Sequence, residues 1–419
     1  MGEPIPFIQI LDDGTFEVDA RAMSLLQSQE TKKIACIAIA GSYRTGKSFL
    51  ANRFLNQMKG FEIGSTQKSC TKGIWIWNKP IRINSEIDAF LIDTEGLHSI
   101  DRYTDLDSKL FTLSILLSSV FIFNSIGHIT QKSIEELALV ANLAKLMQLK
   151  EVNEEEKFDT EATQETDEKL SNDLDKDMSN KAYLFDDEEV DEYTRILPNL
   201  YWVLRDFSLD LDTFTSTEYL DKCLKRVEGE GSENAKKNSI KDAIKTYFPQ
   251  RECHPLVRPV FKEDDIKNIQ DLEYEDLRPE FRSGVETLIK RILKRPKLKC
   301  IAGKYMTGSM LLGIAIEYTE AINNNGIPTI IDSFERVAHS EAQRYIDQLI
   351  EETRMNLKYT INDDTLPMDP ENIEEIFDHI IKKSIRNLSL RLYENTSAYI
   401  IVDVQKQFLK NMQDDFKDI

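Results

Sequence analysis

The chain has 419 residues and a formal net charge of -20, with 41% hydrophobic and 30% charged residues. This length is too great for one compact core, so at least two domains are expected. The acidic balance creates a field that repels polyanions, and it argues against a general affinity for nucleic acids or anionic membrane surfaces.

Cysteine usage and targeting signals point to the cytoplasm. The five cysteines are scattered without any CxxC spacing, which is typical of reduced thiols rather than of a disulfide framework or a zinc site. The first residues lack the basic and apolar regions of a signal peptide, and no uncharged apolar run approaches the ~20 residues that span a bilayer. The end of the chain has no prenylation motif. We therefore expect a cytoplasmic protein with no transmembrane segment and no stable membrane anchor.

Short apolar, β-branched runs alternate with helical patterns in the first part of the chain. Strands are predicted at 34–40, 73–78, 89–93, 120–124, 200–204 and around 256–260, with helices at 47–58 and 133–147. This alternation predicts an α/β domain with a mainly parallel sheet and helices on both faces, over residues 1–300. Beyond it only helical patterns remain, at 310–324, 333–355, 370–392 and 397–416. They predict an all-α helical domain over residues 301–419.

The composition changes sharply between residues 151 and 192, where Asp, Glu, Asn, Ser and Thr crowd out large apolar residues. Such a stretch cannot bury enough apolar surface to offset the entropy lost on ordering it. We interpret it as a mobile insertion of the first domain, with an acidic recruitment segment as the alternative.

Residues 41–48, GSYRTGKS, fit the pattern G-x-x-x-x-G-K-[ST]. A predicted strand precedes this loop and a predicted helix follows it, so backbone N–H groups and a helix N-terminus would converge on phosphate oxygens. Lys47 is expected to bridge the β- and γ-phosphates, and the Ser48 hydroxyl to bind Mg²⁺. The flanking elements favour a phosphate site over an ordinary glycine turn.

A second motif, residues 90–96 (FLIDTEG), is an apolar strand that ends in an aspartate. Asp93 would lie at the carboxyl end of its strand beside the phosphate loop and would hold Mg²⁺ through water. The Gly96 N–H would then meet the γ-phosphate as part of a switch. A strand-end aspartate can also cap a turn, but the pairing with the first motif favours the metal site.

The polar segment 64–73 lies between the two motifs and leads into a strand. A threonine there can complete the Mg²⁺ shell and close over the γ-phosphate, and we select Thr71 for this role. Ser69 is the candidate for orienting the attacking water. An uncommitted surface loop remains the alternative for either residue.

The usual guanine-reading Asn-Lys-x-Asp motif is absent, and residues 202–207 (WVLRDF) are the candidate substitute. A carboxylate such as Asp206 can accept hydrogen bonds from guanine N1–H and N2–H₂, which adenine does not offer. Arg205 could stack along the base. A cap on a following turn is an equally good interpretation of Asp206 from its chemistry alone.

Taken together, these motifs resemble the guanylate-binding proteins, a family within the dynamin-like superfamily of large GTPases, and the related atlastins share the Arg-Asp base reader. The similarity covers roughly residues 7–345 and is most specific over the nucleotide site. Its segments are 41–48, 64–77, 93–97, 124–127, 204–210 and 278–281, together with the helix entry at 327–328.

The resemblance implies that Arg44 is an internal arginine finger, which reaches the γ-phosphate when two GTPase domains meet face to face. It also implies that Ser69 positions water, that Thr71 binds Mg²⁺ and that Glu95 supports the metal site. Nucleotide contacts are expected at Gly41, Tyr43, Arg44, Thr45, Gly46, Lys47, Ser48, Phe49, Gly96, Arg205 and Asp206. The long terminal helices of the family are shortened here, since only about 120 residues follow the predicted GTPase domain.

We therefore expect an α/β P-loop GTPase that needs Mg²⁺, converts GTP to GDP and phosphate, and forms a nucleotide-dependent homodimer. A nucleotide-gated assembly module with slow or vestigial hydrolysis is the alternative, and an ATPase is a third. No residue of the sequence indicates whether GDP is hydrolysed further to GMP.

Overall fold

The structure, a computed structural model, describes residues 2–416 with several gaps. The gaps are 30–31, 43, 63–72, 95–104, 138–196, 230, 302–303, 325–329, 363–364, 366 and 394–397. The predicted insertion at 151–192 lies outside the described residues. The chain divides into two compact units, the first comprising Met1–Lys299 with Met306–Thr329, and the second Cys300–Tyr305 with Ile330–Ile419.

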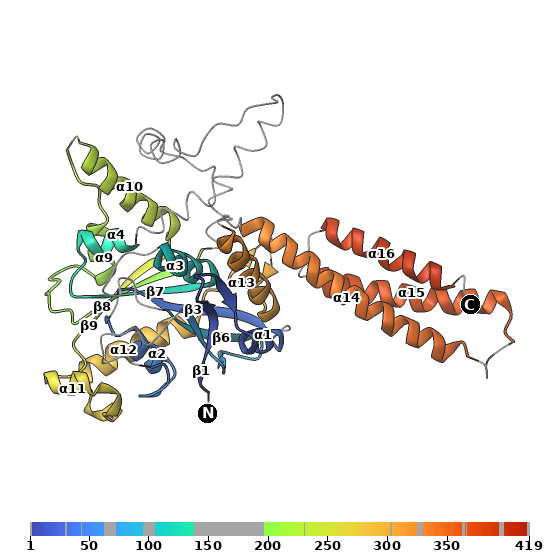
Figure 1. Ribbon diagram of the computed structural model, residues 1–419, viewed down its shortest axis with the longest axis horizontal. Coiled ribbons are helices and arrows are strands. Elements are labelled where there is room, and N and C mark those ends of the chain that lie inside the picture. The colour runs from blue at the N-terminus through green and yellow to red at the C-terminus, as the bar shows by residue number, and fades with distance from the viewer. Residues whose placement is uncertain are drawn as a thin grey trace. The chain divides into compact units, whose positions relative to one another are not determined.

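A nine-stranded mixed sheet forms the centre of the first unit, with the order β2-β1-β4-β6-β3-β7-β8-β9 and β5 beside β6 (Figure 1). The strands are β1 Pro4–Ile10, β2 Phe16–Val18, β3 Lys33–Ala40, β4 Ile74–Trp77, β5 Ile81–Arg82, β6 Ile87–Thr94, β7 Val120–Ile126, β8 Asn199–Arg205 and β9 Arg251–Leu256. The neighbours β6, β3, β7, β8 and β9 pair in parallel, whereas β1, β2, β4 and β5 pair antiparallel. The predicted fold class is confirmed.

Helices cover both faces of this sheet, and most residues of its central strands are accordingly apolar and buried. The helices of the first unit are α1 Ala20–Gln27, α2 Lys47–Phe54, α3 Asp105–Leu117, α4 Gln131–Leu137, α9 Ser216–Cys223, α10 Ser232–Tyr247, α11 Glu263–Lys267, α12 Pro279–Lys294 and α13 Gly308–Asn323. In β7, Val120 and Ile122 join the core beneath α2 and α12, while Phe121 and Phe123 pack edge-on against Phe111 of α3. Alternate residues of one strand thus fill two cores.

Strand β9 ends where the sequence predicts it to begin. We expected a strand around 256–260, but β9 spans Arg251–Leu256. Among the described strands it pairs only with β8 and lies at the edge of the sheet, and its residues are partly polar. An edge strand needs no continuous apolar run, and its sequence therefore carries a weaker signal than a central strand does.

Helix α13 belongs to the first unit, whereas the sequence places it in the helical domain that begins at residue 301. The Asn323 side chain explains the difference, because its amide donates to the Phe16 carbonyl and its oxygen accepts from the Phe16 N–H, both at 2.8 Å. At the other end of α13, a Cβ on Gly308 would lie 2.3 Å from the Leu26 carbonyl oxygen. The helix is therefore fastened to α1 and β2, contacts that sequence periodicity does not reveal.

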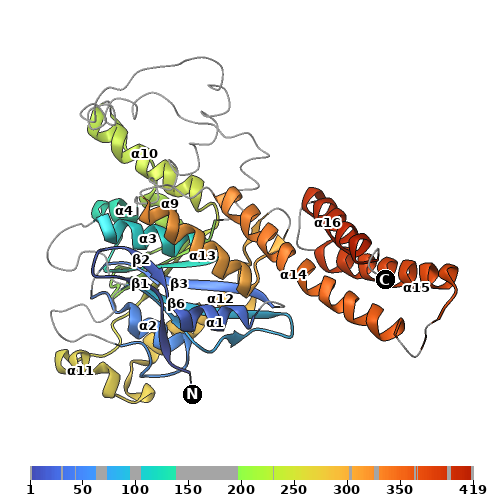
Figure 2. The same cartoon turned by 45° about the vertical axis from the view of Figure 1, so that its right-hand side comes forward.

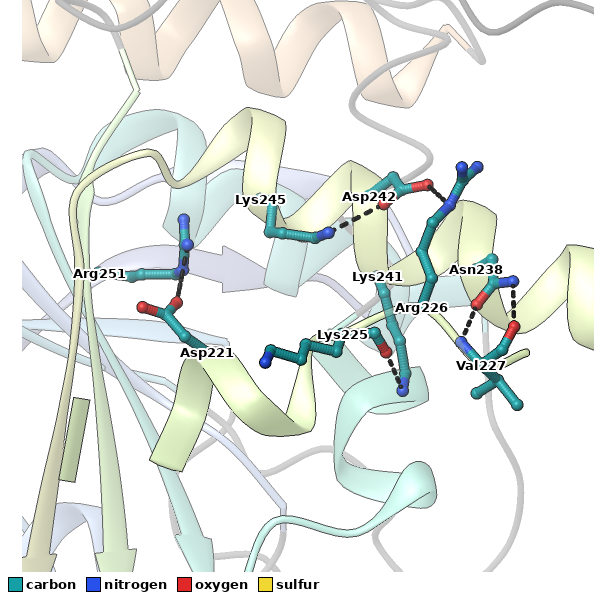
Figure 3. Close-up of polar contacts among 9 residues, drawn as sticks. All are labelled: Asp221, Lys225, Arg226, Val227, Asn238, Lys241, Asp242, Lys245 and Arg251. Carbon is teal, nitrogen blue, oxygen red and sulfur yellow. Dashed lines mark hydrogen bonds and ion pairs between the residues drawn. The ribbon is translucent and has the colours of Figure 1, made fainter. Parts of the chain in front are cut away.

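Polar contacts join the segment after α9 to helix α10 (Figure 3). The Asn238 side chain accepts from the Val227 N–H at 2.7 Å and donates to the Val227 carbonyl at 3.0 Å. Lys241, which is 7% exposed, donates to the Lys225 carbonyl at 2.9 Å, and Asp242 pairs with Arg226 at 2.9 Å. An irregular segment thus satisfies several of its polar groups through the side chains of one helix.

The second unit consists of three helices and a short hairpin. The helices α14 Ile330–Thr360, α15 Pro370–Tyr393 and α16 Ala398–Phe416 lie side by side (Figures 1 and 2), and β10 Cys300–Ile301 pairs with β11 Lys304–Tyr305. Four residues of α16 spaced by four are fully buried, namely Ile400, Val404, Phe408 and Met412. This spacing forms one apolar face, as the helical pattern predicts. In the described parts of the chain, no helix is both long and apolar enough to span a membrane.

Lys299 is an unusual member of the first unit because its amine is buried. The residue is 3% exposed, and its ammonium donates to the carbonyl of Leu116. Burial lowers the pKa of Lys299 to about 7, with nearby Cys36 opposing the shift and Lys297 adding to it. In the unfolded chain this amine stays protonated up to its ordinary pKa of 10.5. Unfolding therefore takes up a proton at pH values between the folded pKa of about 7 and this ordinary pKa.

The free energy of unfolding should therefore rise from pH 7 to pH 9, because the folded state binds fewer protons than the unfolded state. Replacing the buried amine in Lys299→Met should flatten this dependence and raise the stability at pH 7 relative to the parent. Urea unfolding midpoints at pH 7 and pH 9 measure this pH dependence. Lys294→Met, which replaces an exposed amine, is the control. Parallel pH profiles for Lys299→Met and the parent would contradict the prediction.

Candidate functional site

The sheet register brings the sequence motifs together at one edge. Ile39 lies opposite Asp93, Ala40 opposite Phe123, and Ile126 opposite Arg205. Since these strands are parallel, the loop after β3, the end of β6, the start of the β7–α4 connection and the end of β8 all meet at the carboxyl edge of the sheet. Ligands of open α/β sheets bind at this edge.

The loop between β3 and α2 requires glycine at both ends. Gly41 has a φ of +143°, and a Cβ there would lie 2.1 Å from the Asn124 carbonyl oxygen. Gly46 has a φ of +81° and is the N-cap of α2. Both positions therefore exclude larger side chains, one by close approach to β7 and the other by backbone conformation.

Lys47 begins α2 and reaches back across the loop. Its ammonium donates to the Ser42 carbonyl at 3.0 Å, and the Thr45 hydroxyl donates to the same oxygen at 2.9 Å. Lys47 is 7% exposed, so the charge is held inside the curve of the loop. A cation in this position complements an anion bound by the loop.

Ser48 and Asp93 form an oxygen pair next to the loop. The Ser48 hydroxyl donates to Asp93 Oδ2 at 2.6 Å, while Asp93 Oδ1 is buried without a hydrogen-bond partner in the described part of the chain. Burial raises the pKa of Asp93 to about 6, although Ser48 and Lys47 lower it. A buried carboxylate with an unsatisfied oxygen beside a hydroxyl suits a hard divalent cation such as Mg²⁺.

Two side chains for which the sequence predicted no role form hydrogen bonds with the phosphate loop. The Asn124 amide, which is fully buried, donates to the Thr45 carbonyl at 2.8 Å. The Glu136 carboxylate of α4 accepts from the Ser42 hydroxyl at 2.6 Å. Asn124 lies in segment 124–127 of the family resemblance, and this was the only sequence signal that could have pointed to it. Nothing in the sequence pairs Glu136 with Ser42.

Arg205 and Asp206 point to different surroundings at the end of β8. Asp206 is exposed and has a φ of +56°. Arg205 is 5% exposed, and its Nη1 donates to the Gly46 carbonyl at 3.1 Å. We expected Arg205 to stack along a base, but the structure places its guanidinium beneath the phosphate loop.

Of the remaining predicted site residues, some lie in the part of the chain that the structure describes and others lie outside it. Arg44 is exposed on the loop with a φ of +59°. The Phe49 side chain is buried and stacks on Phe281 with ring centroids 6.0 Å apart, so it belongs to the core below the site. Five of the predicted site residues lie outside the described residues, namely Tyr43, Ser69, Thr71, Glu95 and Gly96.

A parallel sheet with a glycine-flanked loop, a lysine at the start of the next helix and an acidic strand end beside it defines the P-loop class of nucleotide-binding domains. The family model described as "Guanylate-binding protein, N-terminal domain" matches residues 13–168 and 169–301. The chain belongs to the guanylate-binding protein family, a family of large GTPases.

Curated relatives agree with this assignment at moderate identity. The chain is 28% identical to guanylate-binding protein 1 of Homo sapiens over 97% of this chain and 66% of that protein. It is 30% identical to guanylate-binding protein 3 of Mus musculus over 81% of this chain and 52% of the relative. With guanylate-binding protein 7 of Mus musculus it shares 28% identity over 81% and 50%, respectively. The chain therefore spans about half to two thirds of the length of these relatives.

Removing the Asn124 amide should weaken the loop that it holds. In Asn124→Ala the Thr45 carbonyl loses its buried donor, and we expect a loss of about 1–3 kcal/mol in unfolding free energy together with weaker guanine-nucleotide binding. Ser125→Ala is a matched control, because Ser125 follows Asn124 in β7 but its hydroxyl accepts from Trp202 Nε1 of β8, at 2.9 Å, and makes no hydrogen bond to the described residues of the loop. Chemical unfolding and calorimetry measure both effects. Equal affinity losses in the two variants would refute a specific role for Asn124.

Proposed function

We propose that this chain is a Mg²⁺-dependent GTPase that hydrolyses GTP to GDP and phosphate. The observation that carries the proposal is the meeting of Lys47, Ser48 and Asp93 at the carboxyl edge of the sheet, within a domain of the guanylate-binding protein family. These residues supply a cation for phosphate oxygens and an oxygen pair for a divalent metal.

Mg²⁺ fits the residues present at this site. Ser48 and Asp93 would hold the ion, and the unsatisfied Asp93 Oδ1 is the atom that gains most from it. When bound, Mg²⁺ neutralises charge on the β- and γ-phosphates. Thr71, which lies outside the described residues, is proposed to complete its ligands, with Glu95 in support.

The protein residues then position and stabilise the triphosphate. Backbone N–H groups of the loop bind phosphate oxygens, and Lys47 exchanges its contact with the Ser42 carbonyl for the β- and γ-phosphates. Arg44 would stabilise charge that develops on the γ-phosphate, and its exposed position on the loop supports this role. Ser69 is proposed to orient the attacking water.

Guanine selection is assigned to Asp206. Its exposed carboxylate follows β8 at the same sheet edge as the phosphate loop, and a carboxylate accepts from both guanine N1–H and N2–H₂. Adenine lacks this pair of donors, so the proposed preference for GTP over ATP follows from hydrogen bonding.

The proposal includes a homodimer through the nucleotide face, in which Arg44 becomes ordered against the γ-phosphate. The second candidate is a nucleotide-gated assembly module with slow hydrolysis, since dimer formation by itself does not require turnover. We also propose that the protein acts in the cytoplasm, because the four described cysteines form no disulfide, as expected in a reducing compartment.

Phosphate release from GTP, measured at increasing protein concentration, tests the proposed function. Specific activity should rise with concentration because dimerisation positions Arg44, and Arg44→Ala should lower the rate by about 10³-fold. Lys47→Ala should abolish nucleotide binding, and exposed Arg21→Ala serves as the control. Absence of turnover at every concentration, with GTP still driving dimerisation, would establish the assembly module instead.

Asp206→Asn should change base preference rather than phosphate binding. The amide presents a donor to guanine N–H groups, so GTP affinity should fall, while xanthosine triphosphate, with a carbonyl at the same edge, should bind better. Calorimetry with GTP, ATP and xanthosine triphosphate measures the change, and the neighbouring exposed Asp210→Asn is the control. An unchanged order of the three affinities would remove Asp206 from base recognition.

A further inference from the structure

The Arg205 guanidinium is in close contact with the phosphate loop. Besides the bond from Nη1 to the Gly46 carbonyl, it lies so close that a Cβ on Gly46 would be 2.8 Å from Nη1. The same carbonyl accepts the first helical hydrogen bond of α2, from the Leu50 N–H at 3.0 Å. Arg205 therefore fixes the peptide at which the loop becomes a helix.

Two aromatic rings support the guanidinium from the other side. Its Cζ lies 5.3 Å from the ring centroid of Phe281 in α12 and 5.9 Å from that of Phe49 in α2. Both rings are buried, and they stack on each other. The guanidinium is thus held between the loop and the two packed rings of Phe49 and Phe281, which limits its movement toward a base.

The charge of Arg205 has little local compensation. Its Nε is buried and has no hydrogen-bond partner among the described residues, and none of their carboxylates forms an ion pair with it. Burial lowers the pKa of Arg205 to about 10, with Asp206 opposing the shift, so the group stays protonated at neutral pH. A desolvated cation under an anion-binding loop interacts with a bound anion more strongly than an exposed one would.

We infer that Arg205 is a positioning residue of the phosphate loop, which holds the Gly46 peptide and adds positive potential beneath the phosphates, and that it does not read the base. This inference rests on the proposed function, and it assigns base recognition and phosphate binding to two adjacent residues. Asp206 contacts the base, while Arg205 contributes equally to any ligand that carries the triphosphate.

Binding of GTP and of inorganic tripolyphosphate, which has no base, separates the two roles. Both ligands are measured in Mg²⁺, GTP by calorimetry and tripolyphosphate by displacement of a fluorescent GDP. Arg205→Met should weaken both by the same factor, about tenfold or more, because it removes a charged hydrogen bond to the loop. Asp206→Asn should weaken GTP alone.

Arg53→Met is the matched control for lost packing. Arg53 is also 5% exposed, and its Cζ lies 5.9 Å from the same Phe49 ring. Its Nε is likewise buried with no hydrogen-bond partner among the described residues, and it makes no hydrogen bond to the described residues of the loop. This variant should leave both affinities within about twofold. If Arg205→Met does not fold, Arg205→Lys keeps a cation in the same space and should show a smaller but still equal loss for the two ligands.

Several outcomes would overturn the inference. A loss confined to GTP would make Arg205 a base contact, and equal losses in Arg205→Met and Arg53→Met would reduce its role to packing. Failure of tripolyphosphate to displace GDP from the parent protein would also refute it, since the loop would then hold no phosphate on its own. A parent protein that binds no guanine nucleotide at all would refute the proposed function itself, a result distinct from these.

Discussion

The site depends on how the carbonyl groups of the phosphate loop are satisfied. The Ser42 carbonyl accepts from Lys47 and Thr45, the Thr45 carbonyl from Asn124, and the Gly46 carbonyl from Arg205. A loop can direct its N–H groups toward an anion only if its carbonyls have partners elsewhere, because a buried unpaired carbonyl is costly. Lys47 of α2 and Thr45 of the loop supply the partners of Ser42, whereas Asn124 of β7 and Arg205 of β8 supply those of Thr45 and Gly46. The conformation of the loop therefore depends on the sheet as well as on the loop itself.

The parallel register explains why distant segments serve one site. Strands β3, β6, β7 and β8 end together, which places Asp93, Asn124 and Arg205 around a loop that is far from each of them in sequence. The apolar layers on both faces fix this register, since a shift by one residue would exchange the residues of the two cores. Core packing thereby sets the distances on which the chemistry depends.

The sequence predicted the parts of the site that are local. The loop at 41–48 and the strand ending at Asp93 carry their chemistry in consecutive residues, and the flanking elements were identifiable from periodicity. Asn124, Glu136 and the true surroundings of Arg205 could not be predicted, because each depends on contacts with the loop from other elements. The place of helix α13 in the first compact unit could not be predicted for the same reason, since the Asn323 contact with Phe16 joins residues 307 positions apart.

The two residues at the end of β8 have different surroundings, and the proposed function gives them different roles. Arg205 is the last residue of β8 and is buried, whereas Asp206 follows the strand in a left-handed conformation and is exposed. Arg205 and Asp206 are adjacent in the chain, and the Arg205 guanidinium that donates to the Gly46 carbonyl has its Cζ 5.3 Å from the ring centroid of Phe281 in α12. Burying an arginine is costly where no carboxylate pairs with it, and among the described residues none pairs with Arg205. Under the proposed function, a triphosphate bound at the loop would offset part of that cost, so that nucleotide binding would favour the ordered loop.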